Sequence, residues 1–509
     1  MSAKEKKTGA DSVLTKNTRE MRDKQDANQD RNFYIKCGVA VAALAVAFVL
    51  CFLYNNEGIR KNMAAVTIDG EKFSATDLDY YYNTVINQYG SYLSYLGVDV
   101  NQDLDAQQYS EDQSWGDYFR SEAVTYLTQT VTMYNAAMAD ENYEISDELQ
   151  QQIDDYSASV DEYCESYSMT REQFLQAQYG EHMTDEIFMK HLTMMFVASD
   201  YSNDYTTNHV YTDDEMQAYY EEHKQDIDLA SYEVLTVNAD YTGIEGKTDG
   251  STDEEPEYTE AQDKQAMEAA MNTANEFLDR VNSGEKLYDI GEEYGSNYYS
   301  NKVDVSYSTF TDYAFDEWVF NDIRTIGEAS VVEDTDRSCW YVVVLNDRHR
   351  PDYNTVNVRH ILIEPAENEL SSEDEGYDAE TAANEAEAAQ KAQDILNEYL
   401  SGPQTEDAFA ELAKENSADS NASEGGLYTQ VYKGEMVDSF EDWCFDESRK
   451  TGDTGIVETT YGYHVMYFVV EDIPYWQVCC TSDMNTQWQN DIYEGSNVKK
   501  HALGIKAIG

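Results

Sequence analysis

The chain contains Phe315-Asp-Glu-Trp-Val-Phe320, and 125 residues later it contains the similar hexapeptide Phe440-Glu-Asp-Trp-Cys-Phe445. A glycine follows the start of each hexapeptide at the same spacing, Gly327 in the first copy and Gly452 in the second. Apolar segments on either side of the hexapeptides recur in the same order. Chance does not hold one register over so many landmarks, so these residues predict a tandem duplication of one domain.

Each copy follows one plan of strands and helices. An opening apolar strand is followed by an acidic insertion, a helix that ends in Ser-Gly, the hexapeptide and a closing apolar strand. The opening strands are Tyr232-Glu-Val-Leu-Thr-Val237 and Val358-Arg-His-Ile-Leu-Ile363, and the closing strands are Trp340-Tyr-Val-Val-Val-Leu345 and Val465-Met-Tyr-Phe-Val-Val470. Short strands separated by helices predict an α+β fold for each copy.

The second copy resembles the parvulin family of peptidyl-prolyl isomerases over residues 355–472. Several segments carry this resemblance in the family's order and spacing: the opening strand, Asn416-Ser-Ala-Asp419, Glu424-Gly-Gly426, Lys433-Gly-Glu-Met-Val437, the hexapeptide and Tyr461-Gly-Tyr-His-Val465. The resemblance implies a four-stranded, mostly antiparallel sheet with flanking helices in each of two tandem parvulin-like domains.

The resemblance also implies the residues of an isomerase site. Three of them would be catalytic, namely the paired histidines His360 and His464 and the carboxylate Asp419. Five more would bind the substrate or support the histidines: Tyr428, Met436, Phe440, Thr459 and Tyr461. Each residue has a simpler reading, because strand histidines and apolar side chains often pack in cores and an aspartate often caps a turn.

The chemistry of such a site requires no cofactor. Rotation about a prolyl amide meets a barrier of roughly 18–20 kcal/mol, but it makes and breaks no bond. An apolar pocket that holds the proline ring and polar groups that favour the twisted amide are sufficient. The sequence has no CxxC or HExxH motif and its eight histidines are scattered, so it predicts neither a metal nor a cofactor site.

The first copy lacks the histidines. Alignment of the copies places Val234 opposite His360 and Cys339 opposite His464. We therefore expect the first copy to keep the fold without the isomerase site, as a spacer or a peptide-binding module.

The N-terminal part has the pattern of a membrane anchor. Residues 1–36 hold nine basic and six acidic residues, and 18 uncharged, mostly apolar residues follow, from Cys37 to Tyr54. A cleaved signal peptide has a shorter head and a shorter apolar run, so the pattern favours an uncleaved signal anchor. The basic head predicts a single-pass protein of the cell membrane, with its N-terminus in the cytoplasm and its C-terminal portion outside.

The region between the anchor and the repeats is predicted to be largely helical. Val66-Thr-Ile-Asp-Gly-Glu-Lys-Phe73 reads as a small hairpin, and apolar residues recur at helical spacing between Trp115 and Met138. Thr170-Arg-Glu-Gln173 and Thr212-Asp-Asp-Glu215 are capping boxes that mark helix starts. The region resembles the chaperone segment of extracytoplasmic foldases of the PrsA and SurA type; a spacer is the alternative.

The composition excludes one class of partner. The 509 residues include 100 acidic and 34 basic residues, a net charge of −66 that repels phosphate backbones, so we expect no nucleic-acid binding. The predicted domains are a cytoplasmic basic tail (1–35), a transmembrane signal anchor (36–55), a helical chaperone-like domain (63–227), a degenerate parvulin-like domain (228–350), a parvulin isomerase domain (351–475) and a C-terminal segment (476–509).

The predicted function is that of an extracytoplasmic foldase. It would catalyse cis–trans isomerisation of X-Pro bonds in unfolded or newly exported polypeptides, and it would also act as a chaperone. The alternative is a holdase or scaffold without enzymatic activity, in which both parvulin-like repeats only bind peptide.

Overall fold

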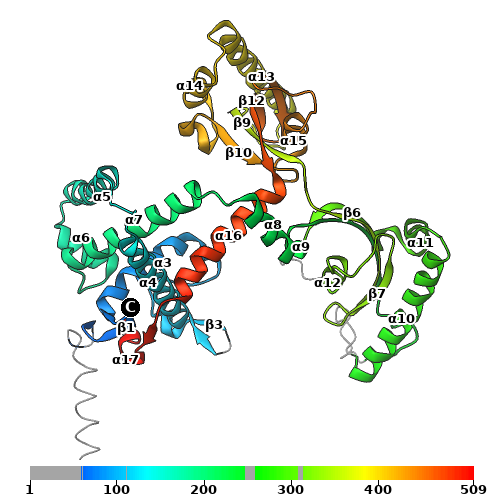
Figure 1. Ribbon diagram of the computed structural model, residues 1–509, viewed down its shortest axis with the longest axis horizontal. Helices are drawn as coiled ribbons and strands as arrows, with labels where there is room; N and C mark the ends of the chain where they lie inside the picture. Colours follow the sequence, from blue (N-terminus) through cyan, green and yellow to red (C-terminus); the bar gives the residue numbers. More distant parts are fainter. Residues whose placement is uncertain (1–58, 60, 111, 247–257, 308–312) are drawn as a thin grey trace, which may run out of the picture. The chain divides into compact units, whose positions relative to one another are not determined.

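The computed structural model describes residues 59, 61–110, 112–246, 258–307 and 313–509 (Figure 1). The chain divides into two compact units, one made of residues up to His209 together with Gln487–Gly509, and the other of Val210–Thr486. The predicted anchor at 36–55 lies outside the described residues. Within the described ranges, no helix is both long enough and apolar enough to cross a membrane.

The first unit is mainly helical. Its helices are α3 (Ala75–Tyr95), α4 (Trp115–Ala139), α5 (Asp147–Ser166), α6 (Arg171–Tyr179) and α7 (Asp185–Asn208), with η1 (Leu104–Ala106) and the short strands β3 (Gln108–Ser110) and β4 (Gln113–Ser114) between α3 and α4. A Ser or Thr caps each of these five α-helices through its hydroxyl, and the predicted capping box at Thr170 is confirmed. The predicted stripe on α4 is buried at Phe119, Ala123, Leu127 and Val131.

A small sheet brings the two ends of this unit together. The predicted hairpin forms strands β1 (Ala64–Ile68) and β2 (Glu71–Ser74), and β13 (Val498–Lys500) pairs with β1 on its other side. After β13, the short helix α17 (Ala502–Ile505) leads to Ala507 and Ile508, which are buried in the same core as α3 and α4. Part of the C-terminal segment thus completes the first unit.

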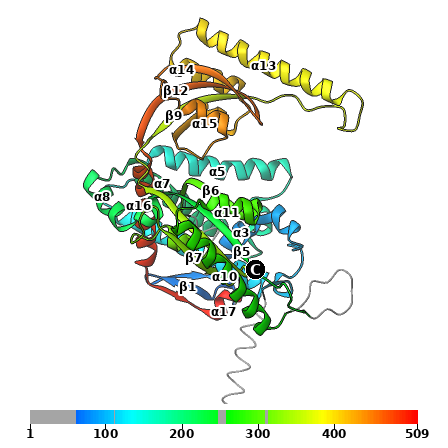
Figure 2. The same cartoon turned by 90° about the vertical axis from the view of Figure 1, so that its right-hand side faces the viewer.

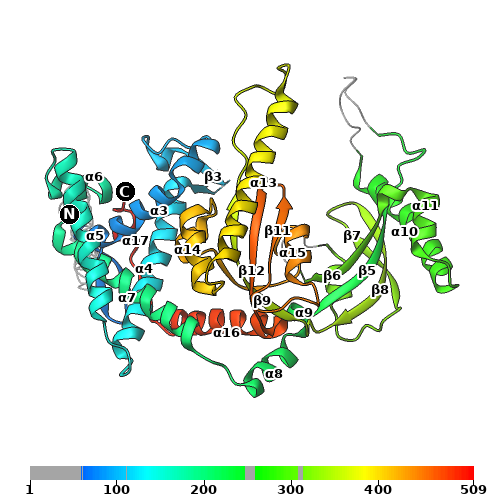
Figure 3. The same ribbon diagram turned by 90° about the horizontal axis from the view of Figure 1, so that it is seen from above.

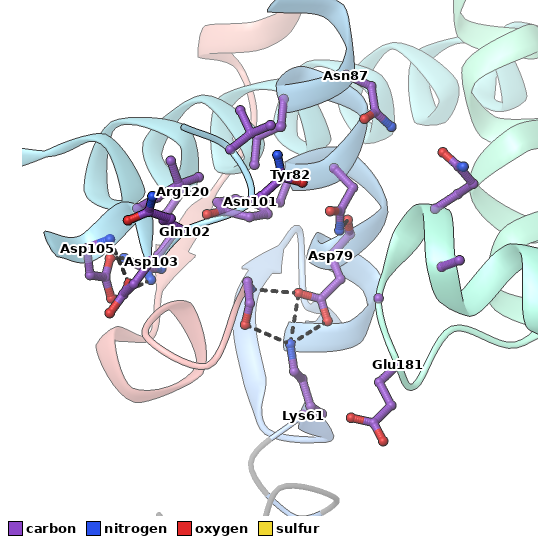
Figure 4. A pocket seen from close by; sticks show the side chains of 18 residues that line it. Lys61, Asp79, Tyr82, Asn87, Asn101, Gln102, Asp103, Asp105, Arg120 and Glu181 are labelled. Atoms are coloured by element: carbon purple, nitrogen blue, oxygen red, sulfur yellow. Dashed lines mark hydrogen bonds and ion pairs between the residues drawn. The ribbon is translucent and has the colours of Figure 1, made fainter. Parts of the chain in front are cut away.

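Lys61 and Asp79 form a buried ion pair in the first unit, beside a cavity of about 650 Å³ (Figure 4). The Nζ of Lys61 lies 2.8 Å from Asp79 Oδ2. The Gly509 amide donates to Asp79 Oδ1 at 3.0 Å, and the Arg120 guanidinium donates to the Ile508 carbonyl at 3.1 Å. These contacts attach the last residues of the chain to α3 and α4.

The second unit begins with α8 (Asp213–Glu222) and α9 (Lys224–Ile227). The predicted capping box at Thr212 starts α8 and is confirmed. Met216, Tyr220 and Ile227 pack against Trp476 and Cys480 of α16 (Tyr475–Glu494). The compact first unit thus stops at His209, earlier than the sequence-based boundary at 227, because α8 and α9 bury their apolar residues within the second unit.

Both repeats lie in the second unit and share one topology (Figures 2 and 3). The first contains β5 (Leu229–Asn238), α10 (Glu260–Asn282), α11 (Leu287–Tyr294), η2 (Ser296–Tyr298), β6 (Tyr299–Ser306), α12 (Asp316–Val319), β7 (Ala329–Asp334) and β8 (Cys339–His349). The second contains β9 (Asn354–Ile363), α13 (Tyr377–Ser401), α14 (Glu406–Asn416), η3 (Ser420–Glu424), β10 (Leu427–Val431), α15 (Asp438–Cys444), β11 (Thr454–Thr459) and β12 (Gly462–Pro474).

Among the described residues, each repeat builds a four-stranded antiparallel sheet, of order β6-β5-β8-β7 in the first and β10-β9-β12-β11 in the second. The predicted α+β fold is thereby confirmed. In the second repeat, one face of the sheet packs on α13 and α14 and the other on α15. Strand alternation divides the residues of β9 and β12 between these two faces, which places the candidate site on the α15 side.

Candidate functional site

Two histidines meet on the α15 side of the second sheet. His360 lies on β9 and His464 on β12, which are neighbouring central strands. The Nδ1 atoms of the two rings are 3.0 Å apart, and the side chains are almost completely buried, with residue exposures of 1% and 5%. This distance is that of a hydrogen bond, so one ring donates and the other accepts.

The β11–β12 hairpin holds the second histidine from behind. Thr459 Oγ1 lies 2.8 Å from His464 Nε2, and the Tyr461 amide donates to Thr459 Oγ1 at 3.1 Å. The Tyr461 side chain is 62% exposed, so in this structure Tyr461 supports the histidine only through its backbone.

Asp419 lies beside the first histidine. Its Oδ2 lies 3.6 Å from His360 Nε2, and its Oδ1 accepts hydrogen bonds from the Asn421 amide at 3.0 Å and from the Tyr428 hydroxyl at 3.4 Å. Asp419 is also the N-cap of η3. The turn-capping reading of this aspartate is therefore confirmed, and its catalytic role stays a prediction.

Aromatic rings enclose the histidine pair. Phe440 of α15 is buried and stands edge-on to both imidazoles, with ring centroids 5.5 Å and 5.4 Å away. The Tyr428 ring stacks on His360 at 5.1 Å, and Met436 packs half-buried against the same cluster. The structure thus brings the eight predicted site residues to one region of the sheet, and their individual roles stay predictions.

Gly426 brings the loop that carries Asp419 close to β9. The His360 amide donates to the Gly426 carbonyl at 2.8 Å, and Gly426 has a φ of +66°. A Cβ at this position would collide with the His360 carbonyl oxygen. Only glycine combines this left-handed backbone with such close contact, so the Gly-Gly pair is a structural device of the site.

Burial keeps both imidazoles uncharged. It lowers the pKa of His360, an effect that the Asp419 carboxylate opposes. Burial and the neighbouring His360 lower the pKa of His464 to about 4. At neutral pH the pair therefore consists of two neutral rings that share one N–H between their Nδ1 atoms.

Comparisons with known proteins identify this repeat. Residues 341–471 match the family model described as the PPIC-type PPIase domain. This part of the chain is a PPIC-type PPIase domain. The chain is 44% identical over 62 residues to foldase protein PrsA 1 of Listeria innocua and 36% identical over 115 residues to foldase protein PrsA of Staphylococcus epidermidis. These alignments cover 12% and 22% of this chain but only 21% and 31% of the relatives.

Solved structures of similar proteins include the peptidyl-prolyl isomerase ESS1 from Candida albicans and PrsA from Bacillus subtilis. The first is 27% identical with a TM-score of 0.18, and the match covers 23% of this chain and 63% of that one. The second is 14% identical with a TM-score of 0.27, and the match covers 80% of this chain and 91% of that one.

The structure corrects one position in the alignment of the first repeat with the PPIase domain. The hairpin closes at the Thr459–Gly462 pair in the PPIase domain and at the Asp334–Cys339 pair in the first repeat. The first repeat thus has two more residues in this turn. The extra residues shift β8, so that Cys339 corresponds to Gly462, and the expectation that it stands opposite His464 was wrong.

Tyr341 takes the place of His464. Its ring stands edge-on to Phe315 at 4.8 Å, as His464 stands to Phe440, and its hydroxyl donates to Asp334 Oδ2 at 3.4 Å. Val234, which pairs with Val343 as His360 pairs with Met466, keeps its predicted position opposite His360. The first repeat therefore has no histidine at either position.

The pKa of His464 leads to a prediction for the PPIase domain. We expect its activity to stay constant from pH 8 to about pH 5 and to fall as His464 becomes protonated near pH 4, well below the usual histidine value of 6.5. Between pH 6.5 and 4 the unfolded chain binds a proton here that the folded chain does not, so this group makes stability rise with pH in that window. Rate profiles and unfolding curves of the wild type and His464→Gln over this range test both; a wild-type midpoint near 6.5 would contradict the prediction.

Proposed function

We propose that the protein is a membrane-anchored, extracytoplasmic foldase that isomerises X-Pro bonds in unfolded or newly exported polypeptides. The observation that carries this proposal is the hydrogen-bonded His360–His464 pair, with its Nδ1 atoms 3.0 Å apart and the Phe440 ring edge-on to both imidazoles. The matched PPIase family model supports the same activity.

The geometry suits rotation about a bond without covalent chemistry. Phe440 and Met436 offer an apolar surface for the proline ring, while Asp419 and the histidines place polar atoms beside it. When the amide twists, it loses conjugation and its nitrogen and oxygen change in charge and hydrogen-bonding capacity. Groups that are already oriented favour that twisted state without the reorganisation that water requires.

The first unit supports a chaperone role. Apolar side chains are exposed at the C-terminal end of α3, where Tyr92 and Tyr95 of the helix and its C-cap residue Leu96 have exposed fractions of 62%, 90% and 52%. Tyrosine combines a large apolar ring with a polar tip, which suits transient contact with unfolded chains. The charge pattern of residues 1–54 supports the anchor and its orientation, with the N-terminus in the cytoplasm.

A peptide isomerisation assay tests the enzymatic proposal. We expect the purified protein to accelerate isomerisation of an X-Pro peptide. Asp419→Ala should lower kcat/KM by about 10-fold, because the charge-assisted interaction of the Asp419 carboxylate in the site is lost. Asp407→Ala, at an exposed acidic position of α14 in the same domain, is the matched control. A wild-type rate equal to the uncatalysed rate would refute the proposal and favour the holdase.

A second candidate function concerns the first repeat, as a peptide-binding module. A cavity of about 400 Å³ opens on the side of its sheet that corresponds to the isomerase site. Val234 and Tyr341 line it at the two histidine positions, together with Tyr232, Tyr313 and Phe315. Lys302 pairs with Tyr232 as Tyr428 pairs with Val358, so the ring that stacks on His360 in the other repeat is also missing. A cavity with several aromatic rings and no histidine in its lining favours binding of a client segment without isomerisation.

Calorimetric titration with an X-Pro peptide distinguishes the two repeats. We expect two peptides per chain in the wild type and one in Thr236→Trp, whose indole would fill the cavity next to Val234. Glu276→Trp, on an exposed position of α10, is the control and should bind two. Equal stoichiometry for Thr236→Trp and the wild type would show that the cavity binds no peptide.

A further inference from the structure

Two buried polar atoms of the candidate site have no hydrogen-bond partner within the described part of the chain: His360 Nε2 and Asn421 Oδ1. His360 is only 1% exposed, so water does not reach its ring freely. A buried polar group left unpaired costs about 1–3 kcal/mol, and such groups are rare in folded proteins. Two of them in one site call for a common explanation.

The contacts of Asn421 determine which way its amide points. Its Nδ2 donates to the Leu427 carbonyl at 3.4 Å, so the opposite orientation would place two acceptor oxygens against each other. Its backbone is held on both sides, since its N–H donates to Asp419 Oδ1 at 3.0 Å and its carbonyl accepts from the Gly426 amide at 3.1 Å. The orientation of the amide thus leaves Oδ1 as a hydrogen-bond acceptor without a donor.

A suitable donor in the same site is the Nε2 atom of His360. Asp419 connects the two residues, because its Oδ1 accepts from the Asn421 backbone amide at 3.0 Å and its Oδ2 lies 3.6 Å from His360 Nε2. The Asn421 side chain also raises the pKa of His360, in opposition to burial. Of the two ring nitrogens of His360, Nδ1 is already engaged with His464, so Nε2 is the atom that remains for Asn421. A hydrogen bond from His360 Nε2 to Asn421 Oδ1 would satisfy both unpaired atoms at once.

We propose that Asn421 is a positioning residue that accepts the Nε2 proton of His360 and thereby sets the direction of hydrogen bonding through the histidine pair. This inference rests on the proposed function and deepens it. Asn421 does not touch the prolyl bond; it acts through His360.

This one contact sets the direction of the hydrogen bonds that run from His360 through His464 to Thr459. With its proton on Nε2, His360 accepts at Nδ1, so His464 donates from its own Nδ1. His464 Nε2 then accepts from the Thr459 hydroxyl, whose oxygen in turn accepts from the Tyr461 amide. In the reverse direction the Thr459 hydroxyl would donate to the Gly462 carbonyl at 3.4 Å, but His360 Nε2 and Asn421 Oδ1 would both stay unpaired, so only the proposed direction satisfies every donor and acceptor. The Asp419 carboxylate, 3.6 Å from His360 Nε2, favours the same proton position.

Without the Asn421 oxygen as acceptor, the His360 proton can move from Nε2 to Nδ1. His360 then donates to His464, and the direction of the hydrogen bonds is reversed. Each ring would then carry its proton on the other nitrogen, and the polar pattern that favours the twisted amide would be lost in part of the molecules. Asn421→Ala is therefore expected to lower kcat/KM by about 10-fold, whereas Asn421→Asp keeps an acceptor oxygen and should retain the wild-type proton position.

The full chain, which contains eight histidines, is labelled with ¹⁵N-histidine. Long-range ¹H–¹⁵N spectra of the imidazole rings then show which nitrogen of each ring carries the proton. The wild type and Asn421→Asp should show His360 protonated at Nε2 and His464 protonated at Nδ1. Asn421→Ala should show a mixture at both rings. Asn416→Ala, in the same domain, is the control and should match the wild type, because the Asn416 side chain donates to the Leu412 carbonyl within its own helix.

Two results would overturn the inference: a wild-type His360 protonated at Nδ1, or an Asn421→Ala spectrum identical to that of the wild type. The wild-type spectrum alone tests the proton position if Asn421→Ala fails to fold. The ring spectra do not depend on turnover. A chain with the expected tautomers but no isomerase activity would therefore refute the proposed function and leave the positioning role intact.

Discussion

Replacing His360 and His464 together by leucine is expected to lower kcat/KM for prolyl isomerisation by about 10²–10³-fold, because oriented polar groups at a buried site contribute roughly 2.7–4 kcal/mol to transition-state stabilisation. The two side chains contact each other, with Nδ1 atoms 3.0 Å apart, and the Thr459 hydroxyl beside His464 has the Gly462 carbonyl as a second partner. Removing both leaves neither imidazole unpaired, and leucine fills a similar volume. We therefore expect the domain to stay folded, which a peptide assay and an unfolding curve check together.

The first repeat supplies the matched control for this double substitution. Val234 and Tyr341 occupy the two histidine positions there, so Tyr341→Leu alters the corresponding buried position without touching the candidate isomerase site. Its kcat/KM should equal that of the wild type. Activity retained by the histidine double variant, or lost in Tyr341→Leu, would move the isomerase site away from the His360–His464 pair.

Asp79→Asn is expected to reduce the free energy of unfolding of the first unit by about 3–5 kcal/mol, because it leaves the charge of Lys61 buried without its counterion. The two residues are 1% and 4% exposed, and Asp79 also accepts from the Gly509 amide. Burial raises the pKa of Asp79, and the neighbouring Lys61 opposes that effect. The charged form of the carboxylate is therefore stabilised by Lys61. Hydrogen exchange of the α3 amides during denaturant titration measures the loss.

Two further variants show whether the buried charge is the cause. Lys61→Met combined with Asp79→Leu removes both charges and should recover most of the stability, since apolar pairs of similar volume replace buried ion pairs at little cost. Glu71→Ala breaks the exposed pair with Lys190 and should cost only about 0–1 kcal/mol. A loss for Asp79→Asn no greater than that for Glu71→Ala would contradict the prediction.

Local patterns predicted much of the fold. Three kinds of feature depend on short stretches of sequence, and the structure contains all of them: the hairpin at β1 and β2, the capping boxes at Thr170 and Thr212, and the apolar stripe on α4. The duplication was readable because two copies in one chain carry the same landmarks. The gathering of the predicted site residues followed from motif order, since strand alternation places His360 and His464 on one face.

Features that depend on pairing across long distances were not readable. The role of the C-terminal segment becomes visible only when β13 pairs with β1, because no local pattern specifies which distant strand a three-residue strand joins. The same limit explains the error at Cys339, where a turn with two extra residues shifts a strand whose composition hardly changes.

By itself, the sequence determined the repeated α+β plan, the PPIase motif, the histidine pair and the charge pattern of the N-terminal head, because each depends on residue types at short and regular spacings. The tertiary structure alone decided that Tyr341 replaces His464, that the last residues close the first unit, and that Asn421 Oδ1 and His360 Nε2 are both left unpaired in the candidate site. These facts depend on register, burial and the direction of hydrogen bonds. Such properties arise only when segments far apart in the chain come into contact.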